Sequence, residues 1–209
     1  TKFERLLETI KDMQAKYPDE KIVLFSSFIP TLEYLHTRLH EHNIDSILLT
    51  GKVKSKDEVL SKFQTDENIK ILLASEVGSE GVDLQFCDTM INYDLPWNPM
   101  RVEQRIGRLD RIGQKSDKIL IWNLFHDSTI DARIYEKLYT KFNICTSVLG
   151  DFEVVLGDMF KQLSLNLLLL SPEEQSKKIE QTERAIINKK IENEKLESSA
   201  AELAAYGDY

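Results

Sequence analysis

The chain has 209 residues, which is enough for one domain of about 150 residues with an appendage. Acidic residues outnumber basic ones by 35 to 27, and the net charge of −8 excludes a histone-like or polybasic protein, so any contact with nucleic acid must come from a local basic patch. The two cysteines, Cys87 and Cys145, form no CxxC pair and indicate no metal site, and we interpret both as buried free thiols in a reducing compartment.

Up to Asn123 the chain alternates between predicted helices and predicted strands. Apolar residues spaced three and four apart predict an opening helix that ends before Pro18, and its charged, amphipathic character differs from a secretory signal peptide. Short apolar runs typical of buried parallel strands follow at residues 21–25, 46–50, 70–74, 89–93 and 119–123. Between them we expect helices from about Pro30 to His42, around Val59 to Phe63, and from Pro99 through the arginine-rich stretch that follows it.

This alternation predicts an α/β fold in which a parallel sheet is covered by helices on both faces. Ligands of such sheets bind at the carboxyl ends of the strands. Polar residues follow the predicted strand ends, and we expect them to converge on one rim: Ser26, Ser27, Thr50, Ser75, Asp83 and the arginine-rich stretch. A domain without a site would also carry some serine and threonine at such positions, so no single one of them defines a site.

The pattern changes in the last third of the chain. Apolar residues predict one helix over about 130–142 and another over 152–169, and Ser171-Pro-Glu-Glu is typical of a further helix start. This last, highly charged helix carries too few apolar residues for an internal position, so we expect a long arm. We therefore divide the chain into a lobe over residues 1–150 and a helical extension over 151–209. No apolar run approaches the roughly 20 residues that a membrane crossing needs.

Residues 101–115 are the most informative stretch of the chain. Read as a helix that starts at Pro99, the stretch places four polar side chains on one helix face: Arg101, Gln104, Arg108 and Arg111. Like charges on one face repel each other, so this arrangement favours a bound anion such as phosphate, which the forked guanidinium suits. The alternative is a solvated basic helix, because charge runs usually mark solvated faces.

Residues 104–114, Gln-Arg-Ile-Gly-Arg-Leu-Asp-Arg-Ile-Gly-Gln, resemble the sixth motif of superfamily 2 helicases and translocases, in the form used by the Swi2/Snf2 ATPases. The resemblance implies that Arg108 and Arg111 are arginine fingers that reach across a cleft toward ATP, so both are candidate catalytic residues together with Gln104. It also implies that Gln104 and Arg105 line the γ-phosphate side of the nucleotide and brace the motif. The Arg-Ile-Gly-Gln ending is the part most typical of Snf2 proteins.

Residues 75–83, Ser-Glu-Val-Gly-Ser-Glu-Gly-Val-Asp, resemble the fifth motif of the same family. The resemblance implies that Ser75 contacts a nucleic-acid phosphate and that Gly81 and Asp83 approach the nucleotide. Glycines allow a tight loop whose backbone comes close to a ligand, and a carboxylate can accept a hydrogen bond from a ribose hydroxyl. The alternative is an ordinary surface loop in which Asp83 caps a helix.

Three further segments strengthen the resemblance. Residues 21–27 resemble motif IV, which implies that Ser26 and Ser27 meet the DNA backbone. Thr50-Gly51 resembles another phosphate-contacting turn. Residues 94–99, Asp-Leu-Pro-Trp-Asn-Pro, resemble a segment characteristic of the Snf2 group, whose tryptophan would be a buried anchor.

Two departures from the usual pattern refine the resemblance. Asp83 and Asp110 stand where eukaryotic remodellers usually carry asparagine and histidine, so the chain is most similar to the bacterial RapA-like branch. The sequence contains neither a P-loop, Gly-x-x-x-x-Gly-Lys-Ser/Thr, nor an Asp-Glu-x-His run. We therefore expect the second RecA-like lobe alone, without the groups that bind Mg²⁺.

The resemblance implies the second motor lobe of an ATP-dependent Swi2/Snf2-type translocase on double-stranded DNA, inactive by itself. ATP with Mg²⁺ would be held by the first RecA-like lobe of the same polypeptide, the C-terminal helices are a candidate surface for a protein partner, and no membrane contact is expected. We expect a cytoplasmic protein associated with the bacterial nucleoid. Two other interpretations remain open: a lobe of a strand-separating DNA or RNA helicase, and a non-catalytic interaction module.

Overall fold

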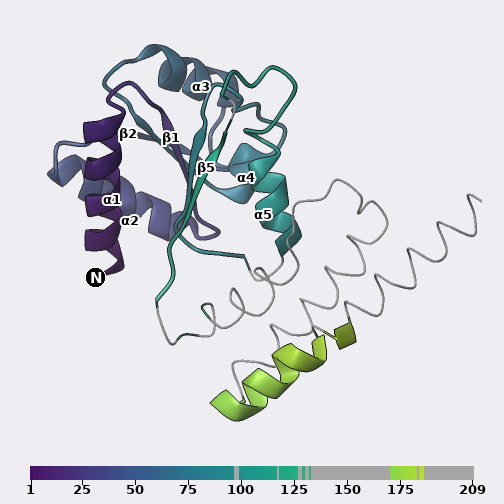
Figure 1. Ribbon diagram of the computed structural model, residues 1–209. Helices are drawn as coiled ribbons and strands as arrows, with labels where there is room; N and C mark the ends of the chain where they lie inside the picture. Colours follow the sequence, from purple (N-terminus) through teal and green to yellow (C-terminus); the bar gives the residue numbers. More distant parts are fainter. Residues whose placement is uncertain are drawn as a thin grey trace, which may run out of the picture. The chain divides into compact units, whose positions relative to one another are not determined.

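The computed structural model describes residues 1–96, 99–116, 118–126, 129, 132, 170–182 and 184–185. The chain forms two compact units, Thr1–Pro96 with Arg101–Asp127 and Trp97–Met100 with Ser128–Tyr209. The first unit holds the sheet and most of the described helices (Figure 1). The domain boundary expected at residue 150 lies outside the described residues.

The described residues form a five-stranded sheet in which every pair of neighbours is parallel. The strands are β1 (Ile22–Phe25), β2 (Ser46–Leu49), β3 (Ile71–Ala74), β4 (Thr89–Asn92) and β5 (Leu120–Asn123), in the order β2-β3-β1-β4-β5. Each strand matches an apolar run of the sequence, and the predicted α/β class is confirmed. β1, at the centre, buries all four of its residues because helices cover both of its faces.

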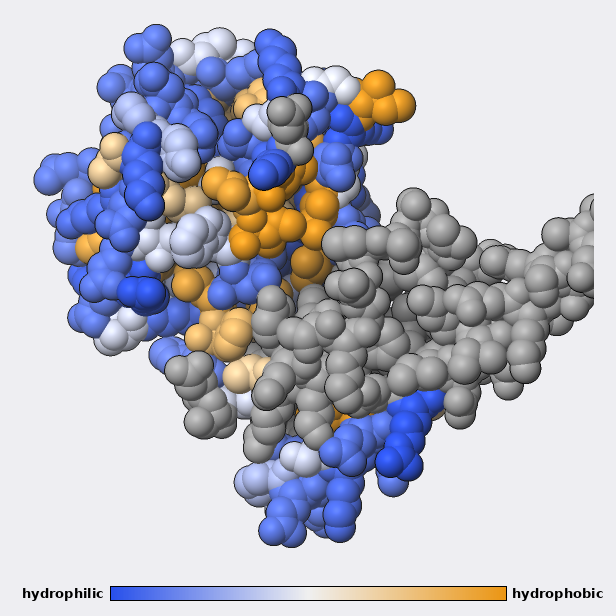
Figure 2. Space-filling view, in the orientation of Figure 1, coloured by the Kyte–Doolittle hydropathy of each residue, from blue (hydrophilic) through white to orange (hydrophobic). Residues whose placement is uncertain are grey.

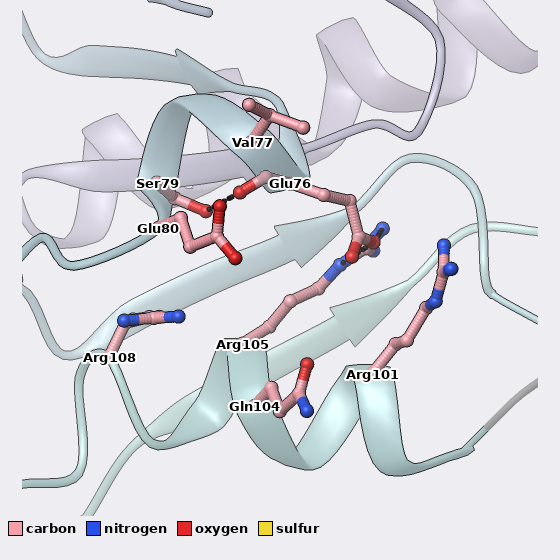
Figure 3. Close-up of a pocket in the computed structure, with 8 residues that line it drawn as sticks. All are labelled: Glu76, Val77, Ser79, Glu80, Arg101, Gln104, Arg105 and Arg108. Carbon is pink, nitrogen blue, oxygen red and sulfur yellow. Dashed lines mark hydrogen bonds and ion pairs between the residues drawn. The ribbon is translucent and has the colours of Figure 1, made fainter. Parts of the chain in front are cut away.

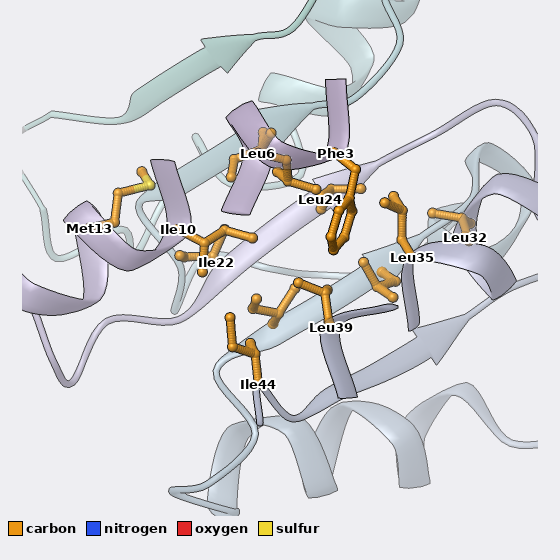
Figure 4. Close-up of a cluster of buried hydrophobic side chains, with 13 residues drawn as sticks. Phe3, Leu6, Ile10, Met13, Ile22, Leu24, Leu32, Leu35, Leu39 and Ile44 are labelled. Atoms are coloured by element: carbon orange, nitrogen blue, oxygen red, sulfur yellow. The ribbon is translucent and has the colours of Figure 1, made fainter. Parts of the chain in front are cut away.

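Five helices of the described part accompany this sheet: α1 (Lys2–Lys16), α2 (Ile29–Glu41), α3 (Lys56–Thr65), α4 (Glu76–Ser79) and α5 (Pro99–Ile106). α1 and α2 pack on one face, where Phe3 and Leu39 join Leu24 of β1 (Figure 4). On the other face, Phe63 of α3 and Leu109, which follows α5, belong to the second apolar cluster. The predicted covering of both faces is therefore confirmed.

α1 shows how local sequence determines one of these helices. The Thr1 side chain accepts a hydrogen bond from the Glu4 N–H while the Glu4 side chain bonds back to Thr1, which is a capping box. The apolar residues at spacings of three and four face the core: Phe3, Leu6, Ile10 and Met13. The helix ends at Lys16, so the predicted end before Pro18 is confirmed.

The carboxyl ends of the strands lie side by side, as the sequence predicts. Phe25, the last residue of β1, is opposite Ala74 of β3 and Asn92 of β4. Leu49 of β2 is opposite Ala74 on its other side. The residues that follow these strand ends therefore share one rim: Ser26, Thr50, Ser75 and Tyr93.

The arginine-rich stretch is helical only in its first half, which corrects the helix expected through its whole length. α5 ends at Ile106, before Gly107, whose missing side chain lowers helix propensity. The Leu84 N–H donates to the Arg108 carbonyl at 2.9 Å, so this carbonyl does not serve a following helical turn. Leu109 is fully buried and holds the turn in the core.

β5 is an edge strand with apolar side chains at the surface, whereas its apolar run alone predicts a buried strand. Leu120, Ile121 and Trp122 are 42%, 38% and 44% exposed. Figure 2 shows apolar surface gathered on one side of this unit. Among the described strands, β5 is last in the order and pairs with β4 alone, and an apolar run does not reveal this position.

In the second unit, residues 172–182 are helical. The Ser171 N–H donates to the Glu174 carboxylate at 2.9 Å and the Glu174 N–H donates to the Ser171 hydroxyl at 3.4 Å, so the predicted helix start is confirmed. The helices expected over 130–142 and 152–169, and the rest of the charged arm, lie outside the described residues. None of the described helices has the length and apolar character that a membrane crossing requires.

Cys87 is a free thiol that is 1% exposed, which confirms its predicted burial. Burial raises the pKa of this thiol far above its ordinary value, so it stays protonated at neutral pH. Cys145 lies outside the described residues.

Glu20 is expected to destabilise the fold at neutral pH. Burial raises the pKa of its carboxyl group above 4.5, and the charge of Asp88 adds to this effect. The folded state holds the proton of Glu20 more tightly than the unfolded state does. The free energy of unfolding therefore falls as the pH rises through the pKa that Glu20 has in the folded state. This loss is absent below the pKa that Glu20 has in the unfolded state. Glu20→Gln should therefore raise the unfolding free energy at pH 7, by less than about 1 kcal/mol because the site is partly solvated.

Urea unfolding of this chain at pH 7 and near pH 4 measures the effect, since the gain should disappear at the lower pH. Glu8→Gln, at an exposed carboxylate of α1, is the control that should change little at either pH. A gain of equal size at both pH values would show that the ionisation of Glu20 is not its cause.

Candidate functional site

A pocket of about 280 Å³ lies between α4 and α5 on the carboxyl side of the sheet (Figure 3). It is lined by Glu76, Val77, Ser79, Glu80, Arg101, Gln104, Arg105 and Arg108. Glu76 and Arg105 neutralise each other in an ion pair of 2.6 Å. Among the described lining residues, the guanidinium groups of Arg101 and Arg108 and the carboxylate of Glu80 then remain, so the lining favours an anion such as phosphate.

α4 is held in place at both ends by its neighbours. The Ser75 hydroxyl accepts a hydrogen bond from the Gly78 N–H at 3.0 Å and caps the helix. A Cβ atom at Gly78 would lie 2.1 Å from the Leu49 carbonyl oxygen, so α4 packs its backbone directly on the end of β2. At the other end, the Lys56 ammonium donates to two backbone carbonyls, both at 3.0 Å.

Arg105 forms the buried side of the pocket, with an exposed fraction of 3%. Its Nε and Nη2 atoms donate to the Glu76 carboxylate at 3.2 and 2.6 Å. Nη1 donates to the Asn92 side chain at 2.7 Å and to the Asp94 carbonyl at 3.0 Å. Nη2 also donates to the Ser27 hydroxyl at 3.3 Å, so all five N–H groups of the guanidinium have acceptors within the chain. These bonds suit a bracing role, and direct contact with a nucleotide stays a prediction.

The four polar residues expected on one helix face do not all meet. Arg101, Gln104 and Arg108 line the pocket, whereas Arg111 is exposed and is not part of the lining. The reason is the turn after Ile106, which redirects the chain before Arg111. Among the described residues, neither Arg101 nor Arg108 forms an ion pair. The roles of Arg108 and Arg111 as arginine fingers stay predictions.

The candidate nucleic-acid contacts share the rim but differ in accessibility. Ser27 and Gly51 are exposed, whereas Ser26, Thr50 and Ser75 are buried. A ligand that approaches the rim therefore meets Ser27 and Gly51 before the other three.

Hydrogen bonds within the chain explain this burial. The Ser26 hydroxyl donates to the Asp94 carboxylate, which also accepts from the Ser27 N–H at 2.9 Å. The Thr50 hydroxyl accepts from the Lys52 N–H at 3.3 Å. Ser26 and Thr50 thus shape the loops that carry the exposed positions of the rim.

Gly81 and Asp83 lie in the turn after α4 and outside the pocket lining. Gly81 has φ = +74°, a left-handed conformation that glycine adopts without strain. The Asp83 carboxylate accepts from the Gln85 N–H at 3.1 Å, which is a local turn bond two residues along the chain. Their approach to a nucleotide stays a prediction.

Sequence reasoning missed four polar residues of this site: Glu76, Glu80, Asn92 and Asp94. Glu76 and Glu80 lie within the motif of residues 75–83, and charged residues in a glycine-rich loop were the available signal. Asn92 ends the apolar run of β4 and is fully buried, so a polar residue at the end of a buried strand was the signal there.

The chemistry that this arrangement supports is the stabilisation of negative charge. In the part of the chain that the structure describes, no group of three or more histidine, cysteine or acidic side chains is arranged to hold a metal ion. On α5, burial raises the pKa of Glu103 above its usual value. Glu103 therefore takes up a proton at a higher pH than an exposed glutamate does, and the negative charge beside the arginines decreases as the pH falls.

Residues 1–113 match the family model described as "Helicase conserved C-terminal domain". The chain is 40% identical over 138 residues to "Uncharacterized ATP-dependent helicase YqhH" of Bacillus subtilis, a match that covers 66% of this chain and 25% of that protein. It is 32% identical over 208 residues to "RNA polymerase-associated protein RapA" of Haemophilus influenzae, which covers 96% of this chain and 22% of that protein. The chain thus spans about a quarter of the length of these curated relatives.

Solved structures share the fold. The C-terminal part of the Fun30 ATPase domain has a TM-score of 0.59 at 25% identity, over 76% of this chain and 53% of that chain. The Sulfolobus solfataricus SWI2/SNF2 ATPase core in complex with dsDNA has a TM-score of 0.60 at 24% identity, over 85% of this chain and 35% of that chain. These matches confirm the RecA-like fold class.

Proposed function

The chain belongs to the helicase conserved C-terminal domain family, as the C-terminal lobe of a Swi2/Snf2-like ATPase, and from this premise we propose that it is the second motor lobe of an ATP-dependent translocase on double-stranded DNA. Relatives named as ATP-dependent helicases imply that the full-length protein hydrolyses ATP. The sequence has no P-loop, so in this proposal the first RecA-like lobe binds ATP and supplies the Mg²⁺ ligands.

The pocket between α4 and α5 is the observation that carries this proposal. Arg108 lies in its lining without an ion pair among the described residues, so its charge is available to an anion. A guanidinium supplied across a cleft stabilises the charge that develops on a transferred phosphoryl group. Arg108, Arg111 and Gln104 are the proposed catalytic residues. The proposed nucleotide-side residues are Gly81, Asp83 and Arg105.

The proposed DNA contacts are on the rim formed by the strand ends. Ser27 and Gly51 would meet phosphates directly, while Ser26, Thr50 and Ser75 shape the surface behind them. Phosphate contacts carry no base information, so binding should tolerate any sequence and weaken steeply with salt. Association with the bacterial nucleoid in the cytoplasm, and a protein partner for the C-terminal helices, are further parts of the proposal.

The test measures translocation and strand separation by one preparation of the full-length protein, with and without ATP. We expect displacement of a triplex-forming strand, no separation of a tailed duplex, and more stimulation of ATP hydrolysis by duplex DNA than by single-stranded RNA. The isolated 209-residue chain is the negative control, since half of the ATP cleft is absent from it.

Each contrary outcome selects another interpretation. Efficient separation of the tailed duplex, or stimulation by RNA alone, would indicate a strand-separating helicase. A full-length protein without ATP hydrolysis would indicate a non-catalytic interaction module. DNA-stimulated turnover by the isolated chain, at the roughly 1–10³ s⁻¹ of typical enzymes, would contradict the expectation that this chain is inactive because half of the ATP cleft is absent from it.

A further inference from the structure

One buried guanidinium contacts both candidate surfaces of this lobe. Arg105 lines the pocket between α4 and α5, and its Nη2 atom donates to the Glu76 carboxylate at 2.6 Å (Figure 3). The same Nη2 donates to the hydroxyl of Ser27 at 3.3 Å, on the exposed rim and 78 residues away along the chain. A ligand at Ser27 and a ligand in the pocket therefore meet at the same side chain.

The direction of the bond to Ser27 leaves a donor for a ligand. Because Ser27 Oγ accepts from Arg105, its own O–H is free to donate to an anion at the rim. A phosphate there would join a chain of hydrogen bonds from Ser27 through Arg105 to Glu76. The hydrogen bonds in such a series polarise one another where water is largely excluded, and Arg105 is almost completely buried.

Glu76 determines where the Arg105 guanidinium points. It accepts two of the five N–H groups and compensates a buried charge that would otherwise be costly. The next carboxylate, that of Asp94, lies 3.9 Å from Nη2 and already binds Ser26 and the Ser27 N–H. Without the charge of Glu76, Arg105 should shift toward Asp94 and disturb the bonds that shape the rim.

Glu76 also belongs to a helix that packs on the residues of the rim. It is the first residue of α4 and follows Ser75, the cap of that helix and a candidate phosphate contact. Gly78 packs the same helix against the backbone of Leu49, at the end of β2. The backbone contact between Gly78 and Leu49 is therefore a second connection between the rim and Glu76, beside the one through Ser27 and Arg105.

From these contacts we infer that Glu76 is a positioning residue that couples phosphate binding at Ser27 to the charge of the pocket, through Arg105. This inference rests on the proposed function and deepens it. In this inference, Glu76 controls how strongly duplex DNA stimulates ATP hydrolysis. The quantity that Glu76 sets is the ratio of the turnover rates with and without saturating DNA.

A double-mutant cycle in the full-length protein tests the inference with Ser27→Ala, Glu76→Gln and the pair of substitutions. Each single change should lower the stimulation ratio by about 5- to 10-fold, within the usual range of coupling between two sites. The double variant should be no lower than Glu76→Gln alone, because both changes interrupt the same chain of contacts. Glu8→Gln, on the exposed side of α1, is the matched control and should keep the wild-type ratio.

A purely structural Glu76 gives a different result. Glu76→Gln would then lower both turnover rates equally and leave their ratio unchanged, which overturns the inference, as would single effects that multiply in the double variant. If Glu76→Gln loses the circular dichroism of the folded protein, Glu76→Asp replaces it with the same expectations, because its shorter side chain withdraws the carboxylate from Arg105.

The experiment distinguishes a failure of the proposed function from a failure of the inference about Glu76. A wild-type enzyme that duplex DNA does not stimulate overturns the proposed function, and the inference with it. A wild type that is stimulated, beside a Glu76→Gln variant with the same ratio, overturns the inference alone.

Discussion

Arg108→Ala in the full-length protein is expected to lower kcat for DNA-stimulated ATP hydrolysis by about 10²-fold or more. The guanidinium lies in the pocket lining and forms no ion pair among the described residues, so its removal costs the fold little. What is lost is the charge that faces the phosphoryl group in the transition state. Arg108→Lys should not restore the rate, because an ammonium lacks the planar fork that binds phosphate oxygens.

The measurement is steady-state kinetics with saturating duplex DNA, together with the melting temperature of each variant. Arg5→Ala is the control, since Arg5 is an exposed arginine of α1. If Arg108→Ala lowers the melting temperature and keeps the wild-type turnover, Arg108 is a structural residue and the proposal that it is an arginine finger is wrong.

Arg111→Ala belongs in the same experiment because the two arginines differ in their surroundings. The resemblance implies a similar loss of turnover, yet Arg111 is exposed and lies outside the pocket lining of this lobe. A loss of comparable size would show that Arg111 acts on a nucleotide bound by the other lobe. Unchanged turnover would restrict the finger role to Arg108.

Gly78→Ala is expected to destabilise this chain by about 3 kcal/mol or more, at or beyond the upper end of the usual cost of overpacking. The added Cβ atom would lie 2.1 Å from the carbonyl oxygen of Leu49 and 2.7 Å from the Cα atom of Thr50. Both are backbone atoms, so no side-chain rotation relieves the overlap. The helix α4 would have to move away from the end of β2, and Glu76 would move with it.

Urea unfolding of the chain measures this loss, with Gly81→Ala as the matched control. Gly81 has φ = +74° and no described atom within 4 Å of its Cβ position, so its substitution carries only the backbone strain, about 1–2 kcal/mol. A larger loss at Gly78 than at Gly81 supports direct packing of α4 on β2. Equal losses would show that the contact at Leu49 yields easily.

The sequence by itself determined the five strands, the helices α1 to α3, the start of α5, and the edge of the sheet where the site lies. A short strand that is covered on both faces must be apolar, so five apolar runs sufficed to predict five strands, although β5 is an exposed edge strand and not a buried one. Parallel strands end on one edge, which placed Ser27, Thr50 and Ser75 on a common rim before any strand order was known. The motif at residues 104–114 also predicted three of the residues in the pocket lining.

Only the tertiary structure decided the strand order, the end of α5 and the partners of Arg105. Glu76 lies 29 residues from Arg105 and Ser27 lies 78 residues from it, and all three meet because β1 lies between β3 and β4. The turn after Ile106 depends on a hydrogen bond from Leu84 and on the burial of Leu109. Helical periodicity describes neighbours three or four residues apart, whereas these contacts depend on which segments pack together, so no local pattern predicted that Arg105 would be buried.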